Sequence, residues 1–263
     1  MNMTRTILMV MLLALLGACN SDKAKQAEQV AEYQTTSESS DHKAMDKKKR
    51  KGEGKRKKGE GKRGEGKKKG GKKGPKTNEQ LGMADNPNNV LGGLKVGDIA
   101  PNFSLKDQNG KTVDLHQMLN EKEVAITFYR GSWCPHCTRQ MSAFTADLDK
   151  LTAANVELLA ISPETQDWSQ EYTKRADIKF PILEDTDHSV SRAYKGFYHV
   201  TDQYRERVMQ GLEKDIASQN GDKTAMLNVP ATYLIGKDKK IKYAFYNVDY
   251  SKRASIDDIV AAI

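Results

Sequence analysis

A tract rich in lysine and glycine divides this 263-residue chain and limits where it can fold. Between Lys47 and Lys76 there are 17 Lys or Arg residues against three Glu, a net charge of +14, together with nine glycines. The like charges repel one another, and glycine loses the most backbone entropy in a helix, so this tract can form neither a helix nor a core. A globular fold must therefore lie outside it.

The net charge of the whole chain, +8 at pH 7, has its origin in the same tract. Residues 77–263 carry 22 basic and 26 acidic side chains, so this C-terminal part of the chain is mildly acidic. The tract contains no aromatic residue that could stack on a base, which argues against a nucleic-acid partner. Two alternatives stay open: the tract binds anionic polymers of a cell envelope, or it is a solvated spacer.

The first 18 residues have the layout of a secretory signal peptide. Arg5 provides a positive charge, residues 7–16 are all apolar, and the small residues Gly17 and Ala18 follow. Ten apolar residues are too few to span a bilayer as a helix, so we expect no integral membrane protein. The position of the run at the N-terminus also argues against a buried core helix.

The end of this segment, Leu16-Gly17-Ala18-Cys19, resembles the lipobox of bacterial lipoproteins. The resemblance implies cleavage before Cys19 and acylation of its sulfur, which would anchor the chain to a membrane. We therefore expect a lipid-anchored protein of the bacterial cell envelope, outside the cytoplasm. Asn20 favours the outer membrane, with the protein facing the periplasm.

Three parts follow from these patterns. Residues 1–18 are expected to be a lipoprotein signal peptide, and residues 19–90 a polar and basic tether that buries too little apolar surface to fold. Residues 91–263 have the composition of a globular domain. Of the three cysteines, one is assigned to lipid, and this leaves a single pair, too few for a disulfide-stapled scaffold.

Within residues 91–263, predicted strands alternate with predicted helices, a pattern typical of an α/β sandwich. The expected strands are a hairpin made of residues 99–105 and 110–115, followed by residues 123–129, 156–161, 180–183, 231–235 and 240–246. The expected helices are residues 135–152, 165–175, 189–194, 201–218 and 254–263.

The residues with reactive chemistry are Cys134 and Cys137, in the sequence Gly-Ser-Trp-Cys-Pro-His-Cys on a strand-to-helix turn. Pro135 suits the first helical position, where the missing N–H costs nothing. Cys134 then lies at the helix N-terminus, where free N–H groups and the helix dipole stabilise a thiolate. Cys137 falls on the same face and can form a disulfide with it. We predict a redox pair with Cys134 as the nucleophile and Cys137 as the resolving thiol.

The two cysteines and His136 could have other roles. The cysteines could be half of a zinc site, but neither a second cysteine pair nor a close histidine pair supplies further ligands. They could form a structural disulfide, although a loop this short at a helix start is normally reducible. We therefore expect neither a metal nor a cofactor. His136 either helps to stabilise the thiolate or is an exposed turn residue, and the first is favoured.

The order of strand, Trp-Cys-x-x-Cys at residues 133–137, helix, and Val-Pro-Ala-Thr at residues 229–232 before a strand resembles the thioredoxin fold. The resemblance implies a central mixed β-sheet flanked by helices. It also implies that Trp133 belongs to the active-site motif and that Pro230 is the cis-proline facing the sulfurs.

The domain more closely resembles the AhpC/TSA, or peroxiredoxin-like, family. The segments that carry this resemblance are residues 96–103, 128–137, 180–185, 228–236 and 249–253. This resemblance implies that the domain is an oxidoreductase, with antioxidant activity as one form of its reaction.

The chain departs from the peroxiredoxin pattern where peroxide would bind. That family has a Pro-x-x-x-Thr-x-x-Cys motif and a distant arginine. Counted along the chain, Arg130 replaces the proline, Cys134 replaces the threonine, Cys137 aligns with the peroxidatic cysteine, and Pro230 lies near the place of the arginine. Arg130 could substitute as the positive group, or form a surface salt bridge.

The Pro-His dipeptide between the cysteines matches oxidants of the DsbA type, whose thiolate is unusually stabilised. Those enzymes carry a helical domain inserted in the fold, whereas the insert expected here, residues 195–222, holds one helix. The dipeptide alone does not set the direction of the reaction.

Three functions follow for testing. The first is a lipid-anchored thiol–disulfide oxidoreductase acting on protein or small-molecule thiols or disulfides, with a separate thiol partner to complete the cycle. The second is a thiol-dependent peroxidase in which Cys137 attacks peroxide and Cys134 resolves. The third is a non-enzymatic, tethered module that binds a metal or an envelope surface.

Overall fold

The computed structural model describes residues 76–221 and 225–263. The predicted signal peptide, Cys19 and nearly all of the basic tract lie outside the described residues. No helix in the described part is long and apolar enough to cross a membrane.

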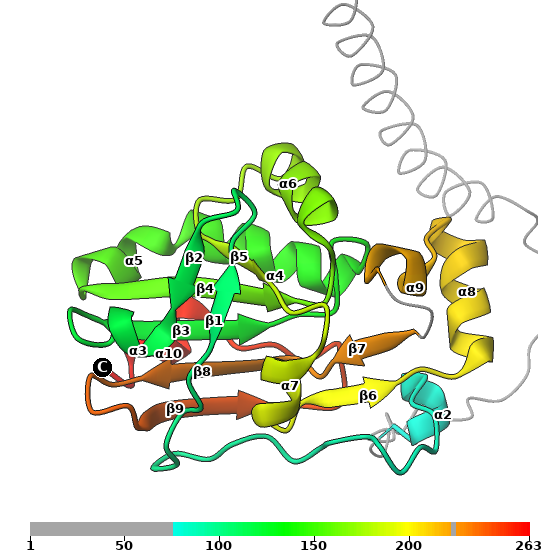
Figure 1. Ribbon diagram of the computed structural model, residues 1–263, viewed down its shortest axis with the longest axis horizontal. Coiled ribbons are helices and arrows are strands. Elements are labelled where there is room, and N and C mark those ends of the chain that lie inside the picture. Colours follow the sequence, from blue (N-terminus) through cyan, green and yellow to red (C-terminus); the bar gives the residue numbers. More distant parts are fainter. Residues whose placement is uncertain (1–75, 222–224) are drawn as a thin grey trace, which may run out of the picture. The chain divides into compact units, whose positions relative to one another are not determined.

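A five-stranded mixed sheet forms the centre of the domain (Figure 1). Its strands, in spatial order, are β5 (Ile182–Glu184), β4 (Val156–Ser162), β3 (Glu123–Phe128), β8 (Ala231–Ile235) and β9 (Ile241–Tyr246). The first three run parallel to one another, and β8 and β9 are antiparallel to their neighbours. The parallel strands are almost fully buried, as expected for apolar runs covered on both faces. The sheet and its flanking helices confirm the predicted thioredoxin-like α/β fold.

Helices cover both faces of this sheet. One core contains Ala125 of β3 and receives side chains from α4 (Pro135–Ala146), α5 (Leu148–Ala153), α6 (Gln166–Arg175) and α10 (Ile256–Val260). The other contains Val124 and Ile126 and receives α3 (Leu115–Met118), α7 (Ser189–Ala193) and the hairpin of β1 (Ser104–Lys106) and β2 (Thr112–Asp114). Neighbouring residues of one strand point to opposite faces, which separates the two cores.

The prediction of one helix over residues 135–152 is wrong in one respect, because the structure has two helices there. The backbone leaves helical geometry at Asp147, with φ −103° and ψ 9°, and α5 begins at the next residue. The apolar stripe continues through the break, since Phe144 and Leu151 pack in the same core. The spacing of apolar residues therefore did not reveal the break.

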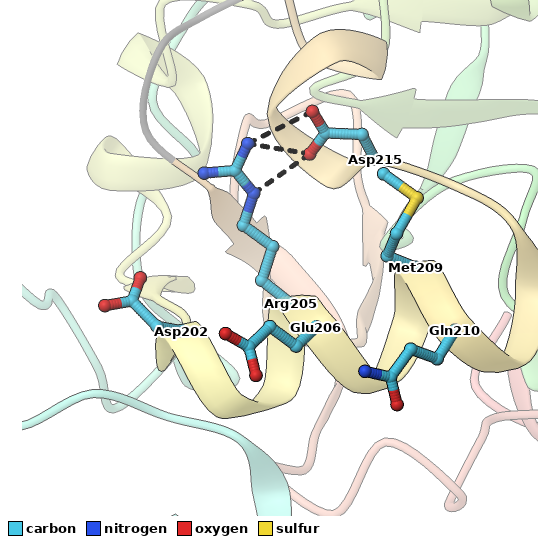
Figure 2. A pocket seen from close by; sticks show the side chains of 6 residues that line it. All are labelled: Asp202, Arg205, Glu206, Met209, Gln210 and Asp215. Atoms are coloured by element: carbon cyan, nitrogen blue, oxygen red, sulfur yellow. Dashed lines mark hydrogen bonds and ion pairs between the residues drawn. The ribbon is translucent and has the colours of Figure 1, made fainter.

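The described part of the predicted insert, residues 195–221, contains more elements than expected. In place of one helix over residues 201–218 there are α8 (Asp202–Leu212) and α9 (Ile216–Gln219), separated where Glu213 adopts φ +53°. Arg205 and Asp215 form an ion pair that joins the two helices, with Arg205 Nε 2.9 Å from the carboxylate (Figure 2). Before and after these two helices, β6 (Phe197–His199) pairs with β7 (Met226–Asn228), two strands that were not expected from the sequence.

The predicted tether boundary at residue 90 lies too far along the chain. Residues 76–90 include α2 (Asn78–Leu81), for which Gly82 is the C-cap, and Leu81 and Met83 are buried in the main core. Met83 also forms a β-bridge with Val200 beside β6. The packed part of the chain thus begins before residue 91.

Candidate active site

The two cysteines lie where β3 passes into α4. Cys134 is the N-cap of α4 with an extended backbone, and Pro135 occupies the first turn, which is the placement that the sequence predicts. Cys137 lies one turn on. Both are free thiols, and the exposed fractions of the residues are only 1% for Cys134 and 0% for Cys137.

The environment makes the two sulfurs chemically different. The pKa of Cys134 is lowered to about 5, first of all by a hydrogen bond from the Cys137 thiol, against the opposing effect of burial. The positive charges of Arg130 and Arg253 and the backbone N–H of Cys137 contribute to the same lowering. Burial, and then the neighbouring Cys134, raise the pKa of Cys137. At neutral pH the pair therefore consists of a Cys134 thiolate and a Cys137 thiol.

Arg130 is inside the protein, not in a surface salt bridge. Its exposed fraction is 1%, and its Nη1 lies 3.8 Å from Cys134 Sγ. The guanidinium carbon lies 5.2 Å from the ring centre of Trp133, 5.2 Å from that of Tyr204 and 4.2 Å from that of Tyr250. We call these three rings the aromatic cage. They stabilise the cation by cation–π interaction while excluding water from it.

Arg253 is a second cation at the pair, which the sequence analysis did not single out. Its Nη2 lies 3.3 Å from Cys137 Sγ, although 116 residues separate the two in the chain. Arg253 falls in a segment that carries the family resemblance, but no local pattern links it to the cysteines. Each sulfur thus has its own arginine.

Glu164 is another residue that sequence reasoning missed. It follows β4, its exposed fraction is 0%, and it accepts hydrogen bonds from Ser132 N at 2.7 Å and from Ser132 Oγ at 2.8 Å. Burial raises the pKa of Glu164 to about 7, and the hydrogen bonds from Ser132 lower it only in part. Because Ser132 is two residues before Cys134, this carboxyl group fixes the loop that carries the nucleophile.

His136 and Pro230 are the remaining predicted residues. His136 Nδ1 is 2.9 Å from Arg139 Nη2, and its ring contacts that of Tyr250. Burial lowers the pKa of His136 even though the Cys134 charge raises it, so a neutral ring is favoured near pH 7. Pro230 is buried directly before β8, whose first residue, Ala231, pairs with Phe128 at the end of β3. Its role opposite the sulfurs stays a prediction.

A hollow of about 270 Å³ opens beside Cys134. It is bounded by the aromatic cage, Pro135 and the α8 residues Arg207, Val208 and Leu212. The insert therefore forms one wall of the approach to the nucleophile. A different hollow, on the other side of α8, is lined by Arg205 and Asp215 and contains no cysteine (Figure 2).

Within the described residues, no group of three or more His, Cys, Asp or Glu side chains could hold a metal ion. The groups in direct contact at the cysteine pair are the two thiols and the guanidinium groups of Arg130 and Arg253.

Gly131, in the active-site loop, is expected to tolerate no side chain. Its φ is +147°, and an added Cβ would lie 2.3 Å from Trp133 Nε1 and 3.1 Å from Glu164 Oε1. We expect Gly131→Ala to lower the free energy of unfolding by about 2 kcal/mol, measured by urea denaturation, because the loop must move. Gly211→Ala is the control: Gly211 lies within α8 with open space around it, and alanine there should stabilise slightly.

Comparison with known proteins places these features in a family. The model of the AhpC/TSA family matches residues 96–244. The chain is 35% identical over 101 residues to peroxiredoxin Bcp of Escherichia coli, which covers 38% of this chain and 64% of that protein. It is 30% identical over 155 residues to a putative peroxiredoxin of Mycobacterium tuberculosis, which covers 59% and 87%. The chain thus spans just under two thirds of the first of these relatives.

Solved structures agree on the fold. The crystal structure of peroxidoxin BcpB from Mycobacterium tuberculosis superposes with a TM-score of 0.51 at 19% identity, over 64% of this chain and 96% of that one. At this identity the similarity establishes the fold alone. Because the family match extends over more than half of the 263 residues, this chain belongs to the AhpC/TSA family.

Proposed function

We propose that the domain is a thiol–disulfide oxidoreductase in which Cys134 is the nucleophile and Cys137 the resolving thiol. The observation that carries this proposal is the inequality of the pair. Cys134 has the lowered pKa, lies at the helix N-terminus and borders the hollow, whereas Cys137 is fully buried with a raised pKa. A thiolate that forms at neutral pH beside an open approach is suited to attack.

In the reductive direction, the Cys134 thiolate attacks one sulfur of a substrate disulfide. The substrate S–S bond breaks, one substrate sulfur leaves as a thiolate, and a mixed disulfide forms on Cys134. Cys137 then gives up its proton and attacks Cys134 Sγ, which releases the second substrate thiolate and closes the Cys134–Cys137 disulfide. The same steps in reverse oxidise a substrate dithiol. A separate thiol or disulfide partner must complete either cycle.

A second candidate is a thiol-dependent peroxidase, favoured by the peroxiredoxin relatives and by Arg253, which lies 3.3 Å from Cys137 Sγ. Cys137, the residue that aligns with the peroxidatic cysteine, would attack a peroxide oxygen. The O–O bond would break to give an alcohol or water and a sulfenic acid on Cys137. Cys134 would then attack that sulfur and release water, which forms the same disulfide.

The two candidates are separated by the rates at which the reduced domain reacts with two oxidants. We expect a small-molecule disulfide to oxidise the pair quickly and hydrogen peroxide to do so slowly. The reaction is followed by tryptophan fluorescence, to which Trp133 contributes from beside the cysteines. Mass spectrometry after thiol alkylation counts the free thiols in each case. Rapid oxidation by peroxide with sluggish disulfide exchange would reject the first candidate in favour of the second.

We further propose that the protein is a lipoprotein of the bacterial envelope, anchored through Cys19 and facing the periplasm. The support is the lipobox-like segment ending at Cys19, and Asn20 after it. The basic tract would then either contact anionic envelope polymers or act as a spacer. Fractionation of cells that produce the full chain tests this: Cys19→Ser should move the protein from the membrane fraction to the soluble fraction, and an unchanged distribution would refute the anchor.

A further inference from the structure

Arg130 is a buried cation that lacks a carboxylate partner in the part of the chain that the structure describes. Its Nη1 points to Cys134 Sγ, its Nη2 donates to the Tyr204 hydroxyl, and its Nε has no hydrogen-bond partner among the described residues. None of the ion pairs in that part of the chain includes it. A guanidinium stays protonated in proteins. Its counter-charge is therefore the thiolate of Cys134.

This arrangement stabilises the reduced state of the pair more than the oxidised state. In the reduced protein the Cys134 thiolate neutralises Arg130, and the aromatic cage surrounds a compensated pair. In the oxidised protein Cys134 is part of an uncharged disulfide, so the same buried cation loses its counter-charge. Burial of an unpaired charge is unfavourable, and cation–π contacts offset only part of the cost. Arg130 therefore raises the free energy of the disulfide form relative to the dithiol form.

We propose, on the basis of the thiol–disulfide function proposed above, that Arg130 makes Cys134–Cys137 an oxidising pair, so that the domain forms disulfides in thiol substrates. Two other features act in the same direction. Arg253 lies 3.3 Å from Cys137 Sγ and adds a second positive charge, and Cys134 lies at the N-terminus of α4. An enzyme whose reduced form is stabilised in this way is a strong oxidant.

The reaction begins with the Cys134–Cys137 disulfide. A substrate thiolate attacks Cys134 Sγ, the bond between the cysteines breaks, and Cys137 leaves and takes up a proton. A second substrate thiolate then attacks the substrate sulfur of the mixed disulfide, and Cys134 leaves as a thiolate beside Arg130. Two electrons pass from the substrate dithiol to the pair, and of its two protons one goes to Cys137 and one to solvent.

A two-electron acceptor of the disulfide class, the disulfide XSSX of a redox partner, would restore the disulfide of the pair. The thiolate, the thiol, one proton and XSSX give the Cys134–Cys137 disulfide and two thiols XSH. This closing step takes up the proton that substrate oxidation released to solvent, so the cycle balances.

Equilibration of the full chain in glutathione buffers of graded redox ratio tests the proposal. We expect Arg130→Met to shift the equilibrium towards the disulfide at least tenfold, which corresponds to about 30 mV for a two-electron couple. Arg130→Lys keeps the charge and should recover most of the wild-type value. Arg192→Met is the control. Arg192 packs 4.7 Å from the Phe197 ring, away from the sulfurs, so its removal should leave the thiol–disulfide equilibrium unchanged. Thiolate absorbance at 240 nm should titrate at higher pH in Arg130→Met than in the wild type.

A wild-type equilibrium close to that of thioredoxin, unchanged in Arg130→Met, would overturn the proposal while leaving thiol–disulfide exchange intact. A pair that does not exchange with glutathione at all would instead reject the proposed function. If Arg130→Met does not fold, the wild type decides: the reduced form must resist urea better than the oxidised form, and the opposite order would overturn the proposal.

Discussion

Replacement of Cys134 by serine is expected to lower kcat/KM for dithiol–disulfide exchange by at least about 10³-fold. The attacking species is a thiolate, and the surroundings lower the pKa of Cys134 to about 5, so that it is ionised at neutral pH. A serine hydroxyl stays protonated there and cannot form a disulfide. In the wild type, the rate of alkylation by iodoacetamide should rise with pH around a midpoint near 5.

Cys137→Ser is the matched comparison, because it removes the other sulfur of the same pair. This variant should still attack a disulfide but stop at the mixed disulfide on Cys134, which intact-mass measurement detects as one retained substrate thiol. Multiple turnover is lost in both variants, so single-turnover attack is the informative quantity. If Cys137→Ser reacted no faster than Cys134→Ser, the nucleophile would be misassigned. Fast peroxide reduction retained in Cys134→Ser alone would make Cys137 the peroxidatic residue.

Glu164→Gln is expected to change how stability depends on pH. Burial raises the pKa of Glu164 from 4.5 to about 7 in the folded protein. Folded Glu164 therefore holds its proton more tightly than the unfolded chain does, and the wild type loses stability as pH rises from about 4.5 to about 7. This shift in pKa corresponds to a loss of about 3 kcal/mol of unfolding free energy by pH 8. Glutamine cannot ionise, so the variant should lack this loss in urea denaturation at pH 5 and pH 8.

The control for this prediction is Glu206→Gln, which removes an exposed carboxyl group on α8 (Figure 2). It should leave the difference in unfolding free energy between pH 5 and pH 8 as in the wild type. Comparison of these pH differences also cancels any constant cost of weaker hydrogen bonds to Ser132 in Glu164→Gln. An equal loss of stability between pH 5 and pH 8 in Glu164→Gln and the wild type would show that this carboxyl group is not the source.

Local pattern and motif spacing were enough to predict the sheet and the position of the cysteine pair. The buried runs at residues 123–129 and 156–161 became β3 and β4, and Pro135 began α4 directly after Cys134. These features depend on residues close together in the chain, where apolar periodicity and helix capping act. The mixed sheet followed from the family resemblance.

The features that could not be predicted depend on contacts between distant residues. Arg253 reaches Cys137 across 116 residues, and Tyr204 reaches Arg130 across 74. In the sequence, Glu164 is an ordinary turn residue after a strand. In the structure, the end of β4 places its carboxyl group where it accepts a hydrogen bond from Ser132. The helix break at Glu213 depends on a single residue with positive φ, which is uncommon for a side chain of this type.

The aromatic cage is built from three separate parts of the chain: the active-site loop, the insert helix α8 and the segment after β9. The domain therefore cannot be shortened to a bare core without losing part of this cage. Removal of residues 201–221 to leave a bare thioredoxin-like core would also remove the Tyr204 ring and hydroxyl from Arg130, and water would enter around the guanidinium. A solvated arginine would favour the thiolate much less, so the shortened protein would keep its cysteines and lose the property that sets them apart.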